Sequence, residues 1–210
     1  MVLLHALGEQ GASWGDVAAK FASSFRVITL DLRGHGTSDW PGTYSFELMR
    51  DDVIGVLDEL DLHDIILIGH SMGGTVAYLL AQAQPSRIAR LIVEDVPPPF
   101  PRTRAVPKRP PGALPFDWAV VPAIVEQVND PTLRYWKHLP DISAPTLLIA
   151  GGPTSQIPQD KLVEVAKLVP DCTLVTIPAG HDVHESQPAA FVAAVLTWLD
   201  TEASAAGRGP

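Results

Sequence analysis

Residues 65–75 read Ile-Ile-Leu-Ile-Gly-His-Ser-Met-Gly-Gly-Thr, and this stretch decides the fold. Four apolar residues in a row are typical of a strand that is buried on both faces of a parallel sheet. Gly69, Ser71 and Gly73 then form a Gly-x-Ser-x-Gly turn, and helical spacing follows over 72–83. A strand, a tight turn and a helix in this order predict that Ser71 presents its hydroxyl at the carboxyl edge of the sheet. The alternative interpretation is a glycine-rich turn with an incidental serine.

The alternation of strand and helix continues through the chain. Short apolar runs predict strands at 2–4, 26–30, 65–68, 91–93, 146–150 and 173–177. Segments with helical spacing separate them, at 14–21, 46–60, 72–83, 160–168 and 188–199. This alternation predicts parallel strands, right-handed crossovers and helices on both faces of the sheet. The predicted fold class is therefore α/β, with a mostly parallel sheet of about six strands.

Composition excludes several classes of protein. The 210 residues suit one domain, and with 46% hydrophobic and 19% charged residues the chain is too apolar to be disordered. No apolar run is long enough for a membrane helix. The acidic balance, 24 Asp and Glu against 15 Lys and Arg, disfavours nucleic acid and anionic lipid as partners. Cys172 has no second cysteine to pair with, and the first residues do not resemble a signal peptide, so we expect a cytoplasmic protein.

One region interrupts the pattern. Residues 97–122 contain nine of the 20 prolines, a density that regular structure does not tolerate. The same region is locally basic, because it has four Lys and Arg residues before its first acidic residue, Asp117. A solvated connector and a lid over an active site are both consistent with this composition. We predict a single domain over 1–202, a lid or cap insertion over 97–140, and a frayed tail over 203–210.

A serine needs a base to become a nucleophile, and His181 is the best candidate. It lies in Ala-Gly-His, after the last predicted strand and before the last predicted helix. Loops at the carboxyl ends of parallel strands meet at one edge of the sheet, so His181 can reach Ser71. His184 is the alternative base, although we expect it to begin the following turn.

With these motifs the chain resembles the α/β-hydrolase fold family, of the serine esterase, lactonase and perhydrolase type, over residues 1–202. The matching motifs are Gly-His-Ser-Met-Gly-Gly at 69–74, Ala-Gly-His at 179–181, Leu-His-Ala-Leu-Gly at 4–8 and Asp-Leu-Arg-Gly-His-Gly-Thr-Ser at 31–38. The resemblance implies that the backbone N–H groups of Leu7 and Met72 form an oxyanion hole. It also implies a structural role for the turn at 31–38, which would support the site.

The chain departs from the family pattern in its first strands. Ala6 stands where the family usually has glycine, which adds a methyl group beside the expected oxyanion hole. The chain begins at what resembles the third strand of the family's sheet. The strand at 26–30 would then be an exposed edge, and exposed edges favour self-association. We therefore predict that this edge is covered by another copy of the chain, in a homo-oligomer, or by the frayed tail.

The acid of the triad is the third departure. Most relatives place an aspartate after the penultimate strand, but residues 151–158 contain no carboxylate. Some relatives use a carboxylate at the end of the strand that follows the nucleophile helix, where this chain has Glu94 and Asp95. Side chains alternate along a strand, so only one of the two can face His181. The match to those relatives favours Asp95; Glu94, or no functional acid, are the alternatives.

The resemblance implies a serine hydrolase that cleaves a small carboxylic ester or lactone through an acyl-enzyme. Ser71 would attack, His181 would carry the proton and Asp95 would orient His181, with no metal or organic cofactor and a small acyl molecule as the partner. A cofactor-free perhydrolase or haloperoxidase would use the same residues. A non-catalytic binding protein is a further alternative. Haloalkane dehalogenase and epoxide hydrolase are disfavoured, because such relatives carry aspartate at the position of Ser71.

Overall fold

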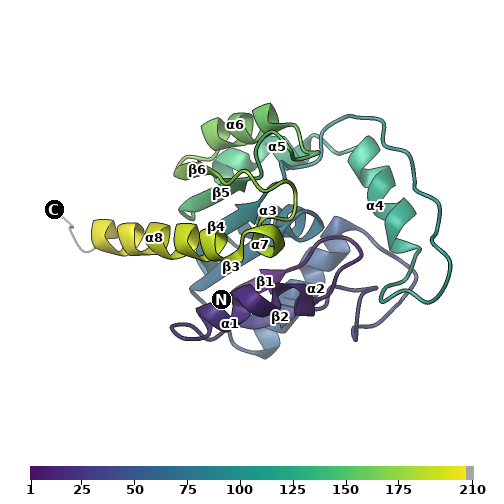
Figure 1. Cartoon of the computed structure of the whole chain (residues 1–210), viewed down its shortest axis with the longest axis horizontal. Coiled ribbons are helices and arrows are strands. Elements are labelled where there is room, and N and C mark those ends of the chain that lie inside the picture. The colour runs from purple at the N-terminus through teal and green to yellow at the C-terminus, as the bar shows by residue number, and fades with distance from the viewer. Residues whose placement is uncertain (207–210) are drawn as a thin grey trace.

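A six-stranded, all-parallel sheet with strand order β2-β1-β3-β4-β5-β6 forms the centre of the molecule (Figure 1). The computed structural model describes residues 1–206. The strands are β1 (Val2–Leu4), β2 (Ile28–Leu30), β3 (Ile65–His70), β4 (Ile88–Glu94), β5 (Thr146–Ala150) and β6 (Cys172–Thr176). All six predicted strands are present, those at 2–4 and 146–150 with the predicted ends and the other four with shifted ends, and the predicted α/β class is confirmed.

Successive side chains along a strand point to opposite faces of the sheet. Apolar side chains therefore lie on both faces, and helices cover both. Leu3, Ile68 and Ile92 belong to one apolar cluster, which is covered by α1 (Gly15–Phe21), α7 (Val183–Ser186) and α8 (Pro188–Ala206). Their neighbours Leu4 and Leu67 belong to the other cluster. That face is covered by α2 (Phe46–Glu59), α3 (Met72–Ala83) and α6 (Gln159–Leu168). The pattern explains why the central strands are almost continuously apolar.

Helix α8 is longer than its predicted range of 188–199. It continues to Ala206, so the first part of the predicted frayed tail, 203–206, is helical. The remainder of that tail, 207–210, lies outside the described residues. Within residues 1–206, no helix combines the length and the apolar character that crossing a membrane requires.

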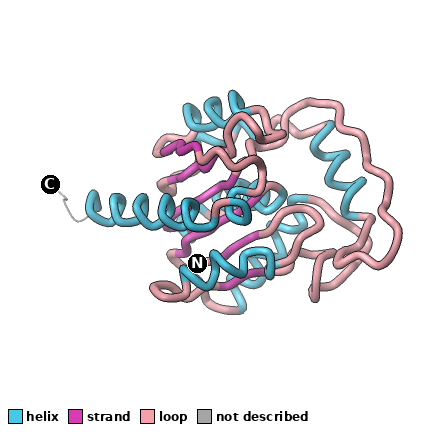
Figure 2. The backbone as a smooth tube through the Cα atoms, viewed as in Figure 1, coloured by secondary structure: helices cyan, strands magenta, loops and turns pink. Residues whose placement is uncertain are grey.

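The proline-rich segment between β4 and β5 extends away from the sheet as a long loop (Figure 2). Regular structure resumes at α4 (Val120–Asn129) and α5 (Arg134–Lys137), with short 3-10 turns elsewhere at Gly11–Trp14, Pro85–Arg87 and Leu139–Asp141. The loop is fixed to the turn after β2: Asp117 N donates to Gly34 O at 2.7 Å, and Phe116 forms an isolated bridge with His35. The segment is thus irregular but attached to the domain at its far end.

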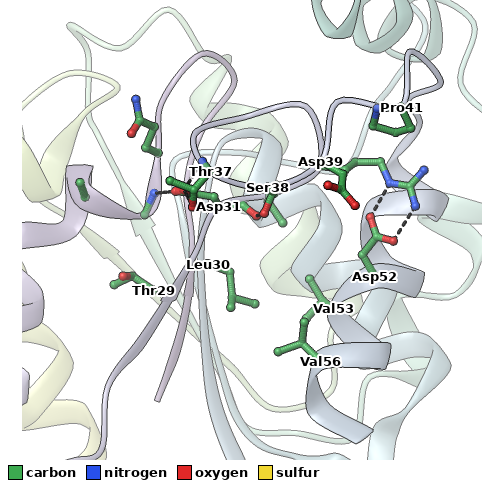
Figure 3. A pocket seen from close by; sticks show the side chains of 15 residues that line it. Thr29, Leu30, Asp31, Thr37, Ser38, Asp39, Pro41, Asp52, Val53 and Val56 are labelled. Carbon is green, nitrogen blue, oxygen red and sulfur yellow. Dashed lines mark hydrogen bonds and ion pairs between the residues drawn. The ribbon is translucent and has the colours of Figure 1, made fainter. Parts of the chain in front are cut away.

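Strand β2 lies at one edge of the sheet, where the sequence predicted an edge. A pocket of about 740 Å³ lies beside it, between β2, the turn at 31–38 and α2 (Figure 3). Asp52, paired there with Arg33, and Val53 contribute to its wall from α2. Ser71 does not line this pocket. The homo-oligomer expected through this edge stays a prediction.

Two glycines permit the turn between β3 and α3. A Cβ at Gly69 would lie 2.5 Å from Gly73 O, and a Cβ at Gly73 would lie 2.3 Å from Leu4 O. Both distances are far below van der Waals contact, so any side chain here would separate α3 from the sheet. Ser71 between them has φ +50° and ψ −113°, a conformation that non-glycine residues rarely adopt. Close helix–strand packing stabilises this strained serine.

Gly73→Ala should therefore lower the free energy of unfolding by about 3 kcal/mol, the upper end of the usual cost of overpacking. Gly55→Ala is the matched control, because the Cβ it adds within α2 meets no atom within 4 Å. Alanine is the better helix former, so Gly55→Ala should be neutral or stabilising by up to about 1 kcal/mol. Urea unfolding of both variants checks this; equal effects would contradict the packing argument.

Candidate active site

Ser71 lies between the end of β3 and the first turn of α3. Its backbone N–H donates to Glu94 O at 3.3 Å, and its carbonyl accepts from Thr75 N at 3.1 Å. These contacts fix the serine against β4 on one side and α3 on the other. The first N–H groups of α3 have no acceptor within the helix, although Gly73 N donates to His5 O at 3.1 Å. The positive dipole end of α3 stabilises negative charge that develops beside Ser71.

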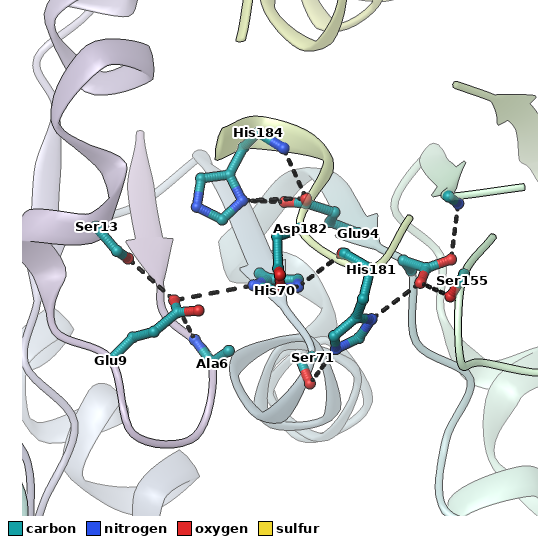
Figure 4. A network of polar contacts seen from close by, with 12 residues as sticks. Ala6, Glu9, Ser13, His70, Ser71, Glu94, Ser155, His181, Asp182 and His184 are labelled. Atoms are coloured by element: carbon teal, nitrogen blue, oxygen red, sulfur yellow. Dashed lines mark hydrogen bonds and ion pairs between the residues drawn. The ribbon is translucent and has the colours of Figure 1, made fainter. Parts of the chain in front are cut away.

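His181 and Asp95 complete a chain of hydrogen bonds from Ser71. His181 Nε2 is 2.9 Å from Ser71 Oγ, and His181 Nδ1 is 2.9 Å from Asp95 Oδ2 (Figure 4). His181 follows β6 and Asp95 follows β4, so the carboxyl ends of three strands supply the three groups. The structure thus brings together the three residues that the sequence predicted as catalytic.

Asp95 is fully buried, and its carboxylate is satisfied by several donors. Gly151 N donates to Oδ1 at 2.7 Å, Gln159 Nε2 donates to Oδ1 at 3.1 Å, and Ser155 Oγ donates to Oδ2. A buried carboxylate needs such donors to stay charged. The loop at 151–158 contains no acid, but it supplies hydrogen-bond donors to Asp95, which follows the neighbouring strand β4. This role was not predicted from the sequence; Ser155 in a loop without a carboxylate and Gln159 at the start of α6 were the available signal.

Glu94 faces the opposite direction and forms a second acid–histidine pair. Its carboxylate accepts from His184 N at 2.8 Å and lies 2.9 Å from His184 Nδ1. Both side chains are buried. His184, the alternative base, is thus bound to Glu94, while His181 contacts Ser71. Sequence analysis did not foresee this pair, although alternation along the strand predicted that Glu94 and Asp95 would diverge.

His70 connects the two acid–histidine pairs. Its Nε2 is 3.0 Å from the His181 carbonyl oxygen, and its ring lies 4.8 Å from the His181 ring and 5.1 Å from the His184 ring. Burial lowers the pKa of His70, but the charges of Glu94, Glu9 and Asp182 outweigh burial and raise it to about 9. The raised pKa predicts that His70 is protonated at neutral pH, although its Nδ1 has no hydrogen-bond partner among the described residues. The sequence did not predict this charge.

Two other histidines hold the loop that carries Leu7. Leu32 N donates to His5 Nε2 at 2.9 Å, and Gly8 N donates to His35 Nε2 at 3.1 Å. Burial lowers the pKa of His5, and burial together with His5 lowers that of His35 to about 4, so both rings are neutral acceptors. The predicted supporting role of the turn at 31–38 matches these contacts.

Asp31 adds a third connection from the same turn. It accepts from Gly11 N at 2.8 Å and from Thr37 N at 2.8 Å. Burial raises the pKa of Asp31, but the hydrogen bonds from Thr37 and Gly11 outweigh it and lower the pKa. Ala6, the departure from the family pattern, is accommodated: it is buried, and its N–H donates to Glu9 Oε2 at 3.2 Å.

Ser71 and His181 open into a cavity of about 180 Å³. Leu7 and Met72, the two predicted oxyanion donors, line the same cavity. The opposite wall comes from the proline-rich segment and α4, and includes Pro97, Pro99, Arg102, Arg104, Ile124 and Val128. Several residues of the segment at 97–140 thus line the site, and the lid stays a prediction.

Two groups of side chains in the described part of the chain have the composition of a metal site, and one of them, His70, His181 and Asp182, includes the base of the triad. In the other group, the ligand atoms of Glu9, His70 and His184 lie within 4.8 Å of one another. However, His70 Nδ1 and Glu9 Oε2 are 3.9 Å apart, whereas ligands of tetrahedral zinc at 2.0–2.1 Å lie about 3.4 Å apart. Glu9 Oε2 also already accepts from Ala6 N and Ser13 Oγ. The group fits an ion pair around His70 better than it fits a metal.

The chain is similar to known hydrolases in sequence and in structure. The alpha/beta hydrolase family model matches residues 1–195. The sn-1-specific diacylglycerol lipase ABHD11 of Mus musculus is 26% identical, over 95% of this chain and 80% of the lipase. Epoxide hydrolase 4 of Mus musculus is 38% identical, over 52% of this chain and 32% of that protein. A thermophilic esterase from Thermogutta terrifontis superposes with a TM-score of 0.79 and 27% identity, over 95% of this chain and 89% of that one.

The raised pKa of His70 predicts a pH-dependent stability. In the unfolded chain the pKa is near 6.5, so protonation stabilises the fold fully below pH 6.5. This contribution is lost as the pH rises from about 6.5 to about 9, and its size is on the order of 3 kcal/mol. His70→Gln removes it, so the difference in free energy of unfolding between wild type and variant should shrink across that range.

Urea unfolding at pH 6, 7.5 and 9, roughly the interval in which the folded and unfolded pKa values differ, measures this difference. His63→Gln, at an exposed histidine, is the control and should leave the pH dependence unchanged. Parallel curves for wild type and His70→Gln would show that His70 is not a buried cation.

Proposed function

Because this chain belongs to the alpha/beta hydrolase family, we propose that it hydrolyses a small carboxylic ester or lactone through an acyl-enzyme on Ser71. The observation that carries the proposal is the hydrogen-bonded chain from Ser71 through His181 to Asp95, which opens into a cavity of about 180 Å³. A nucleophile, a base and an orienting carboxylate in hydrogen-bond contact are what acyl transfer requires. The relatives named lipase and esterase support an ester substrate.

In the first half of the reaction, Ser71 Oγ attacks the ester carbonyl while His181 Nε2 accepts the hydroxyl proton. Asp95 holds Nδ1 of the ring and stabilises the imidazolium that forms. The carbonyl oxygen gains negative charge, which the N–H groups of Leu7 and Met72 stabilise. His181 then donates its proton to the departing alcohol oxygen, and the acyl group remains on Ser71.

Deacylation uses the same groups with water as the nucleophile. His181 Nε2 accepts a proton from water as the water oxygen attacks the acyl carbonyl, and returns a proton to Ser71 Oγ as the acid leaves. His70 positions the base in both halves, because its Nε2–H binds the His181 carbonyl at 3.0 Å. Its positive charge lies close to the His181 ring, where it would oppose an imidazolium, and the carboxylates of Glu9 and Glu94 offset that charge.

A serine nucleophile favours acyl substrates over epoxides, although Epoxide hydrolase 4 is among the relatives. Attack of a serine oxygen on an epoxide carbon would form an ether, and water does not hydrolyse an ether near neutral pH. Attack on an acyl carbon forms an ester, which the same site can cleave again. The chemistry of Ser71 is therefore matched to acyl transfer with turnover.

The role of Asp95 is tested by Asp95→Asn. The amide can still contact the ring but favours the wrong tautomer and cannot stabilise the imidazolium, so kcat for 4-nitrophenyl acetate should fall by on the order of 10⁴. Asp160→Asn, at an exposed carboxylate on the neighbouring helix α6, is the matched control and should retain wild-type kcat.

Ser71→Ala should abolish turnover and labelling by a fluorophosphonate without unfolding the protein. Folding is checked by circular dichroism for each variant. Near wild-type activity in folded Asp95→Asn would remove Asp95 from the mechanism, and activity in folded Ser71→Ala would remove the acyl-enzyme.

A further inference from the structure

Two arginines line the cavity that contains Ser71. Both belong to the proline-rich segment; Arg102 is half-buried and Arg104 is exposed. The chain as a whole carries a net charge of −9, so a pair of cations in this position is not a consequence of overall composition. A guanidinium presents several donors in a plane and binds carboxylates in a bidentate manner.

Neither arginine has an anionic partner among the described residues. Within residues 1–206, no carboxylate oxygen forms an ion pair with Arg102 or Arg104. Arg102 Nε is buried and lacks a hydrogen-bond partner, while its guanidinium carbon lies 4.9 Å from the centre of the Phe100 ring. Burial and the neighbouring Arg104 lower the pKa of Arg102. A half-buried cation with an unsatisfied donor is costly unless an anion binds it.

The backbone that carries the two arginines is anchored. Trp136 Nε1 donates to Pro99 O at 2.8 Å. Arg104 N donates to Asn129 Oδ1 at 2.7 Å, and Asn129 Nδ2 donates to Arg104 O at 2.8 Å. The cations therefore lie on a segment fixed at both ends, so binding an anion needs little further ordering of the backbone.

The carboxylates on the opposite wall have partners of their own. Glu9 accepts from Ala6 N and Ser13 Oγ and lies 3.9 Å from His70 Nδ1. Asp182 lies 3.7 Å from His70 Nε2. Both negative charges are thus directed at His70, and neither neutralises Arg102 or Arg104.

We propose that Arg102 and Arg104 form a subsite for a carboxylate, and that the preferred substrates are esters that carry a carboxylate in addition to the scissile group. The ester part of this inference rests on the proposed function, and the carboxylate part rests on the two arginines. The cavity is small, about 180 Å³, so the carboxylate is only a few bonds from the reacting carbonyl. Hydrogen bonds to charged groups contribute about 1.5–3 kcal/mol each, which corresponds to roughly 10- to 150-fold in binding.

Matched pairs of esters test the subsite. 4-Nitrophenyl glutarate carries a carboxylate on the acyl chain, and 4-nitrophenyl valerate is its neutral counterpart; 4-acetoxybenzoate and 4-acetoxybenzamide form the same pair on the alcohol side. The readout is the ratio of kcat/KM for the anionic and the neutral ester. In wild type this ratio should exceed one for at least one pair, after correction for spontaneous hydrolysis. Arg102→Gln and Arg104→Gln should each lower it by about tenfold or more.

Arg109→Gln is the matched control, because Arg109 belongs to the same segment but does not line the cavity. It should retain the wild-type ratio. A ratio near one in wild type for both pairs, or a ratio that neither cavity variant changes, would overturn the subsite even if all four esters are hydrolysed.

A binding measurement separates this inference from the proposed function. Calorimetric titration of monomethyl glutarate into Ser71→Ala, and into Ser71→Ala with Arg102→Gln, requires no turnover. Binding that weakens about tenfold or more with Arg102→Gln supports the subsite even if the wild type hydrolyses no ester. Absence of binding to Ser71→Ala at millimolar concentration, or equal binding to both proteins, would overturn it.

Discussion

The backbone of α3 reaches the sheet because residues 69 and 73 have no side chains. This contact holds Ser71 at φ +50°, places it directly after β3 and aligns the start of α3 with the cavity. Every other group of the site is arranged around that position: the Leu7 loop on β1, the acid on β4 and the base after β6. The strain at one residue is compensated by packing along two strands and a helix.

Strand β4 then determines which histidine becomes the base. Glu94 ends β4, whereas Asp95 follows the strand with φ +45°, and each of the two carboxylates binds a different histidine. Asp95 receives donors from the loop at 151–158 and faces His181; Glu94 binds His184 in the apolar layer beneath α8. His70 lies between the two pairs, and the neighbouring carboxylates raise its pKa and so favour its protonated form. The two pairs have similar chemistry, and only the one that contacts Ser71 is placed for acyl transfer.

Local patterns in the sequence predicted the strands, the layers and the turn at Ser71, because these depend on residues close together in the chain. The family match confirms the resemblance that the motifs indicated. His181 and Asp95 could be proposed because loops at strand ends converge. Three other features could not be predicted from the sequence: the Glu94–His184 pair, the charge on His70, and the donors from Ser155 and Gln159. These features depend on burial or on contacts between residues 60 or more positions apart. The arginines of the proline-rich segment were visible only as a basic stretch; the fold places them beside the nucleophile.

The acyl-enzyme itself is the most direct test of this account. Wild-type protein mixed with 4-nitrophenyl acetate, quenched in acid within milliseconds and digested, can be analysed by mass spectrometry. We expect one acetyl group, on the peptide that contains Ser71. If deacylation is the slower half, a burst of 4-nitrophenol of matching amplitude accompanies it. Turnover with the acetyl group on another residue would contradict this mechanism. Turnover without any acylated peptide, under conditions in which deacylation is slow enough for an acyl-enzyme to accumulate, would also contradict it.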